Sequence, residues 1–145
     1  MKNILLLILS ISIISCNSGQ FENSKNTMVN IEQSELSNEK IKSHTFLECM
    51  YQDSYFPEFL VDKCKNILIA LCKNIEESKP KNLDELYVLT HASTGKINNL
   101  ENEFFENDSE IETAARECLG LDFEYISNAY GFEADVEELI ANRYW

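Results

Sequence analysis

The chain has 145 residues, with twelve Lys and Arg against 25 Asp and Glu, so its formal net charge is −13 at pH 7. This surplus of negative charge excludes nucleic-acid binding, because contact with phosphates requires the opposite sign. It also argues against attraction of the folded part to anionic lipid.

The first fifteen residues predict a lipoprotein signal peptide. Lys2 precedes a run of Ile and Leu that is too short to cross a membrane, which takes about 20 apolar residues. The run ends in Ile13-Ile14-Ser15-Cys16, which resembles a lipobox, the motif whose cysteine is acylated before cleavage. We therefore expect Cys16 to become the lipid-bearing N-terminus, with acyl chains such as palmitate. The alternatives are an ordinary signal peptide with a chance cysteine and a buried apolar element.

A lipid on Cys16 would place the protein in the bacterial cell envelope. Two or three acyl chains hold a protein stably on a membrane, at about 0.8 kcal/mol per buried methylene. Asn17, rather than Asp, follows the cysteine, which favours the outer membrane if the cell has one. The folded part would then face the periplasm or the exterior, and the mature chain would carry a net charge of −14.

Residues 16–41 predict a flexible polar tether. They consist mainly of Asn, Ser, Gln, Glu and Lys. Such a segment buries too little apolar surface to offset the entropy lost on ordering. The tether is expected to lead into an acidic domain at residues 42–145, long enough for one hydrophobic core.

The sequence of this domain predicts an all-α fold, a single small bundle of four to five helices. The first helix is short and has apolar residues at helical spacing from Phe46 to Tyr51. Pro57 suits the start of a second, central helix, because the first turn needs no amide there. Lys79-Pro80-Lys81 ends that helix. Its broad apolar stripe comprises Leu60, Cys64, Ile67, Leu68, Leu71, Cys72 and Ile75.

The third helix is predicted to begin after Asn82, with Glu85 three residues on as in a capping box. Its apolar positions run from Leu83 to Phe104, with Gly95 as a weak point.

Ser109 and Glu112 form a second such pair, which predicts the start of a fourth helix. Gly131 suits a helix C-terminus. A short last helix would follow, with an apolar face formed by Val136, Leu139 and Ile140.

Several strings of this domain are long and specific. They are Met50 to Pro57, Phe59 to Lys63, Lys79 to Leu83, Leu89 to Ala92, Ser109 to Cys118, Ala129 to Phe132 and Val136 to Ile140. Over about residues 44–145 they resemble an uncharacterised bacterial family, domain of unknown function 5713 (DUF5713). The resemblance implies no activity. Members of that family usually begin near the domain, without an export signal, so export here counts against roles that need ATP or reduced thiols.

The acids gather toward the C-terminus, where residues 100–145 hold thirteen acids against two arginines. One interpretation is a set of solvated helix faces and helix N-termini. The other is a docking surface for a basic protein, and its candidate residues are Glu101, Glu103, Glu106, Asp108, Glu110 and Glu112. This run lacks the register of a calcium loop, and we expect no metal site and no cofactor.

Four cysteines remain after Cys16: Cys49, Cys64, Cys72 and Cys118. The pair Cys64–Cys72 lies about 12 Å apart along one helix, beyond disulfide reach. Cys49 with Cys64 or Cys72, and Cys118 with the other, stay open. The favoured expectation is that all four are small buried apolar residues. No Cys or His spacing indicates zinc.

Acid–base chemistry has two candidate histidines. His44 is expected to be exposed. His91 lies on the third helix, where Asp84 could orient it toward Thr90 or Ser93 as a nucleophile. No nucleophile elbow or oxyanion loop accompanies it, so a structural histidine is favoured. The aromatic side chains of Tyr51, Tyr55 and Phe56, just before Pro57, are expected to pack in the core or at a helix corner rather than to form a binding platform.

The leading hypothesis is a lipid-anchored, non-enzymatic interaction module, in its sharper form an inhibitor or immunity protein for a basic envelope partner. The alternative is a small envelope hydrolase using His91 with nearby carboxylates. A structural, self-associating envelope protein is a third hypothesis.

Overall fold

The computed structural model describes residues 32–145. The predicted signal peptide, the predicted lipidation site Cys16 and the predicted tether as far as residue 31 lie outside these residues. The described part comprises a 3₁₀ turn and seven α-helices, with no strand. They are η1 (Gln33–Glu35), α1 (Glu39–Lys42), α2 (Glu48–Tyr51), α3 (Glu58–Ser78), α4 (Leu83–Asn98), α5 (Glu101–Glu106), α6 (Thr113–Ala129) and α7 (Val136–Leu139).

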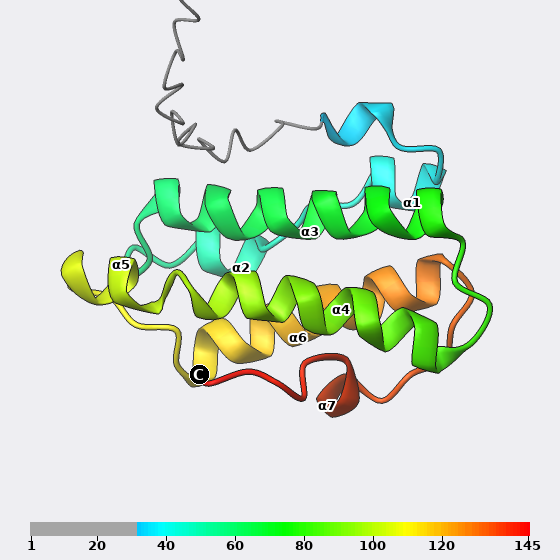
Figure 1. Cartoon of the computed structure of the whole chain (residues 1–145). Helices are drawn as coiled ribbons and strands as arrows, with labels where there is room; N and C mark the ends of the chain where they lie inside the picture. Colours follow the sequence, from blue (N-terminus) through cyan, green and yellow to red (C-terminus); the bar gives the residue numbers. More distant parts are fainter. Residues whose placement is uncertain (1–31) are drawn as a thin grey trace, which may run out of the picture.

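Three long helices make the bundle, and the all-α prediction is confirmed. α3 and α4 run antiparallel and side by side, and α6 packs behind them (Figure 1). The short helices fill the edges: α2 contacts both α3 and α6, and α7 contacts α4 and α6. α5 lies at one end of the bundle and α1 near the other, at the left and right of Figure 1.

The central helix α3 follows its prediction. Pro57 is the N-cap residue, and Lys79 ends the helix in a left-handed conformation at φ 52°. The predicted stripe is fully buried, and Val61 and Ile69 widen it. A helix that buries this much of its surface contacts several neighbours at once, which explains why α2, α4 and α6 all pack on it.

The third helix is interrupted, and the interruption is not at Gly95. Asn82 caps α4 as predicted, accepting the Glu85 amide at 2.9 Å. The helix continues through Gly95 and ends at Asn98, and α5 begins at Glu101. The side chain of Asn98 accepts the Tyr144 amide and donates to the Asn142 carbonyl, so the C-terminal segment is tied to the last turn of α4.

The capping box predicted at Ser109 is wrong. The N-cap of α6 is Glu112, in extended conformation, and the helix begins at Thr113. Ser109 and Ile111 are buried. Residues 109–112 lie outside any helix, and the Ser109 hydroxyl has no hydrogen-bond partner within the described chain, so it caps no amide there.

Gly131 ends α6 as expected. It adopts φ 87°, in the region that favours glycine. The amide of Phe132 bonds to the Ser127 carbonyl, and that of Gly131 to the Asn128 carbonyl. These are the two hydrogen bonds of a Schellman motif, which turns the chain toward α7.

The boundary of the tether at residue 41 needs correction, because the fold begins earlier. η1 and α1 pack on the bundle through Leu36 and Ile41, which are both buried. Asn38 caps α1 and also donates to the Ala129 carbonyl at 2.9 Å. Two isolated apolar residues in a polar stretch were too sparse to show a pattern, yet each fills a place in the core.

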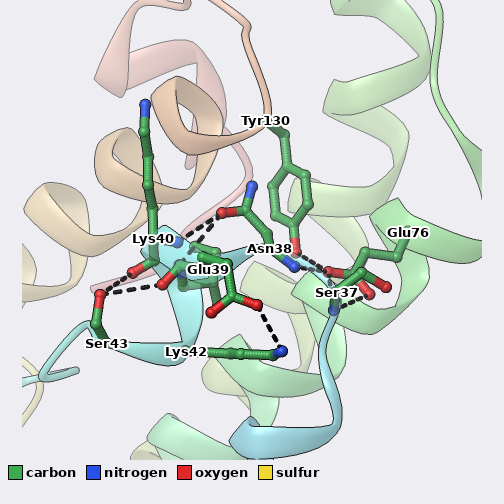
Figure 2. Close-up of polar contacts among 9 residues, drawn as sticks. Ser37, Asn38, Glu39, Lys40, Lys42, Ser43, Glu76 and Tyr130 are labelled. Carbon is green, nitrogen blue, oxygen red and sulfur yellow. Dashed lines mark hydrogen bonds and ion pairs between the residues drawn. The ribbon is translucent and has the colours of Figure 1, made fainter.

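Glu76 fastens this N-terminal arm to α3. Its carboxylate accepts the backbone amides of Ser37 and Asn38 at 2.8–3.0 Å and the Tyr130 hydroxyl at 2.9 Å (Figure 2). Burial by itself raises the pKa of Glu76, but these hydrogen bonds stabilise the carboxylate and lower the pKa below its usual 4.5. The clamp is therefore strongest when Glu76 is charged.

Replacing Glu76→Gln should loosen the arm, at a cost of about 1 kcal/mol, since hydrogen bonds to a charged acceptor are replaced by neutral ones. Because the folded-state pKa is lowered, the contribution of Glu76 is present above its unfolded pKa and is lost as pH falls through the folded one. Urea unfolding of both proteins at pH 7 and at successively lower pH measures this. The difference in unfolding free energy between the wild type and the variant should shrink as the pH falls below 4.5; a difference that does not change with pH would contradict the clamp.

Candidate functional site

The predicted acidic residues gather at one end of the bundle. α5 carries Glu101, Glu103 and Glu106, and the following loop carries Asp108, Glu110 and Glu112. All six are exposed or half-buried. Within residues 32–145, Glu103 alone of the six makes an ion pair, with Lys63 of α3. Five carboxylates at this end therefore face solvent without a cationic partner from the described chain.

Exposed aromatic side chains accompany these acids. Phe105 of α5 is 72% exposed and Phe59 of α3 is 48% exposed. The Lys63 ammonium links Phe59 to the acids, since it lies 5.8 Å from the centre of the Phe59 ring and pairs with Glu103. We call this surface the acidic end: the six acids with Tyr55, Phe59 and Phe105.

Of the aromatic side chains expected in the core or at a helix corner before Pro57, Tyr55 is not a core residue. Phe56 is buried, but Tyr55 is 40% exposed. Partial desolvation, and then the charges of Glu112 and Glu110, raise the pKa of Tyr55. The ring therefore lies within the field of the acidic loop, which periodicity alone did not indicate.

His91 does not form the catalytic arrangement with Asp84 that the hydrolase alternative requires. Its Nε2 lies 2.7 Å from the carbonyl oxygen of Glu138, and its ring stacks on Tyr87. Because a carbonyl only accepts, Nε2 must donate its proton there and cannot act as a base. Asp84 is exposed at the start of α4 and makes no contact with His91 among the hydrogen bonds of the described chain. His91 fastens α7 to α4.

The cysteines pair in a way that the sequence reasoning missed. Cys49 of α2 and Cys118 of α6 form a disulfide, with Cα atoms 6.1 Å apart and a separation of 69 residues. The expectations of four free thiols, or of Cys49 bonded to Cys64 or Cys72, are both wrong. In the chain-entropy account, closing a loop of this length stabilises a fold by about 4 kcal/mol.

Cys64 and Cys72 are free and buried in α3. Burial raises the pKa of each thiol to about 12. A thiol needs its thiolate form to react, so both are inert in the folded protein. Here the expectation of small buried apolar residues is confirmed.

His44 is not exposed as expected but forms the only His–carboxylate pair among residues 32–145. Its Nε2 lies 2.6 Å from Oδ1 of Asp122, which is 6% exposed. The ring stacks on Tyr125 with centroids 3.8 Å apart and meets Phe46 edge-on. Burial raises the pKa of Asp122, and the hydrogen bonds from His44 and the Leu47 amide oppose that rise.

Leu47 shows how firmly the segment that follows His44 is held. It adopts φ 55°, a left-handed conformation that costs a non-glycine residue about 1–2 kcal/mol. Its side chain is buried, and its amide donates to Oδ2 of Asp122 at 2.7 Å. Burial and a charged acceptor together offset the strain.

A hollow of about 610 Å³ lies beside these groups, between residues 44–52 and α6. Both sulfur-bearing residues of the disulfide and both members of the His44–Asp122 pair line it. Its other lining residues are Thr45, Leu47, Glu48, Gln52, Leu121, Glu124, Tyr125 and Asn128.

In the part of the chain from residue 32 to residue 145, no helix is both long and apolar enough to cross a bilayer. No three His, Cys, Asp or Glu side chains in it come together as ligands for a metal ion.

The fold and these surfaces define a small helical domain with an acidic end and one disulfide-lined hollow. The model of a family of unknown function, DUF5713, matches residues 40–145, and the chain belongs to this family. No curated protein and no solved structure matches the chain.

Alkylation followed by mass measurement tests the cysteine assignment. We expect no domain cysteine to react in the native protein, two in denaturant without reductant, and four once a reductant is added. Peptide mapping should identify the two cysteines that react in denaturant without reductant as Cys64 and Cys72. Labelling of Cys49 or Cys118 before reduction would contradict the pairing.

Proposed function

We propose that this protein is a membrane-tethered, non-enzymatic interaction module whose acidic end binds a basic protein of the cell envelope. The observation that carries the proposal is the set of carboxylates at that end, most of them without a cationic partner from residues 32–145. An inhibitor or immunity protein for a basic exported toxin or hydrolase is its sharper form.

Charge and aromatic surface support the proposal together. Complementary charge raises the rate of encounter and selects among partners. Exposed aromatic rings supply the contacts that dominate binding energy once a partner has docked. Phe105, Phe59 and Tyr55 stand among the acids, which is the composition expected of a docking surface rather than of a purely solvated helix face.

The alternative, a small envelope hydrolase using His91, has less support. The Nε2 proton of His91 is engaged by a carbonyl, and Asp122 beside His44 also accepts the Leu47 amide. Both histidines therefore serve contacts that hold the fold.

The test captures partners from the organism's own envelope with the lipid-anchored protein at low salt. An acidic-end variant is compared with a control variant that has the same change in charge elsewhere. The first carries Glu101→Gln, Glu106→Gln, Glu110→Gln and Glu112→Gln. The second carries Glu32→Gln, Glu35→Gln, Glu77→Gln and Glu133→Gln.

We expect the wild type and the control variant to recover the same basic protein and the acidic-end variant to lose it. Four exposed charges at about 0.4 kcal/mol each should weaken Kd about tenfold. Raising the salt should weaken the wild-type complex as well. Equal recovery by the two variants, or an affinity unchanged by salt, would count against the acidic end and reopen the hydrolase alternative.

A further inference from the structure

We propose that the Cys49–Cys118 disulfide is a site of thiol–disulfide exchange, and that the hollow beside it admits small cationic or neutral thiols in preference to anionic ones. The proposal is independent of the acidic end, which lies on α5 and the loop after it.

The two sulfur-bearing residues differ sharply in access. Cys49 is an exposed residue of the short helix α2, whereas Cys118 on α6 is only 3% exposed. Exchange requires a thiolate to approach one sulfur in line with the S–S bond, so access decides which sulfur is attacked. Attack therefore falls on Sγ of Cys49, and Cys118 is the leaving group.

The hollow provides room for the attacking molecule. Its volume of about 610 Å³ exceeds that of a small thiol with two or three carbon atoms, and both cysteines lie in its wall. Leu121, which is 62% exposed, gives the wall an apolar side. A small thiol can thus reach Cys49 without unfolding of the domain.

The charges of the wall select among thiols. Glu48 and Glu124 are exposed and Asp122 is paired with His44, while none of the twelve lining residues is Lys or Arg. Such a wall repels an anionic thiol and concentrates a cationic one. Charge focusing of this kind changes encounter rates by about tenfold or more at low salt.

The segment around Cys49 should stay in place when the bond is cut. Leu47 and Met50, on either side of Cys49, are buried, and the Leu47 amide and His44 both bind Asp122. None of these contacts depends on the Cys49–Cys118 bond. They keep Cys49 close to Cys118, so the bond can form again.

The chemistry balances with one external thiol. The thiolate RS⁻ forms a bond to Sγ of Cys49, the Cys49–Cys118 bond breaks, and its electron pair leaves on Cys118, which then takes a proton from water. The product is a mixed disulfide at Cys49. A second thiol releases it as RSSR and leaves both cysteines reduced, so the incoming thiol is the reductant.

The test measures the rate of disulfide cleavage in the native full chain by cysteamine, 2-mercaptoethanol and mercaptoethanesulfonate at low ionic strength. Each rate is divided by that of the same thiol with hydroxyethyl disulfide, which removes intrinsic reactivity. We expect cysteamine to exceed mercaptoethanesulfonate by about tenfold after this correction. The difference should shrink in 0.5 M salt.

Two variants with equal changes in charge sharpen the result. Glu48→Gln with Glu124→Gln should remove most of the preference, and Glu35→Gln with Glu133→Gln should keep it. Peptide mapping after brief exposure should find the thiol on Cys49. The proposal is overturned if the adduct forms on Cys118 or if the corrected rates do not depend on the charge of the thiol. It is also overturned if cleavage has the same rate for all thiols at every concentration, because unfolding would then limit cleavage.

Discussion

Cys118 and Asp122 lie one helical turn apart on α6, and each binds the same short segment, residues 44–52. One link is covalent and the other is a buried carboxylate that receives both a histidine and a backbone amide. Residues four apart on a helix share a face, so the two links act on one side of α6. They hold α2 between α3 and α6 and keep Leu47 in a conformation that it would not adopt alone.

The rest of the domain follows from this attachment. With α2 fastened, the buried side chains of Phe46, Leu47 and Met50 complete the core between the long helices. The hollow lies where this segment meets α6. Near the C-terminal end of α3, Glu76 holds the N-terminal arm in a similar way: its carboxylate accepts the amides of Ser37 and Asn38, as Asp122 accepts the Leu47 amide.

The domain therefore separates its surfaces. The acidic end stands on α5 and its loop, held to the bundle by the Lys63–Glu103 pair and by buried Phe104. The hollow lies between α2 and α6 and is lined by a different set of acids. The two proposed activities use different residues: a basic partner would bind at the acidic end, and a thiol would react at the hollow. Substitutions can therefore alter one activity without altering the other.

Local signals in the sequence predicted the fold well where one short stretch decides the outcome. Pro57, Asn82 and Gly131 each set a helix boundary through their own backbone or side chain, and each is at the predicted place. Ser109 carries the same kind of signal and fails, because burial of its neighbour Ile111 outweighs a cap worth about 1 kcal/mol.

The site was harder to predict, because its contacts join residues far apart in the chain. His44 and Asp122 are separated by 78 residues and the two bonded cysteines by 69. The acidic residues are neighbours in the chain, so their grouping follows from the sequence alone, but the sequence had no means of showing that Tyr55 and Phe59 stand beside them. Leu36 and Ile41 are too isolated in their polar surroundings to be recognised as core.

Hydrogen–deuterium exchange of the oxidised and the reduced domain tests the central claim most directly, that residues 44–52 are held to α6 by two separable links. Reduction should speed exchange in α2 and in the adjoining turn of α6, while the Leu47 amide stays protected by Asp122 and α3 and α4 are unchanged. Faster exchange throughout the bundle, or loss of protection at Leu47 together with α2, would show that the disulfide alone holds the segment and would contradict the account.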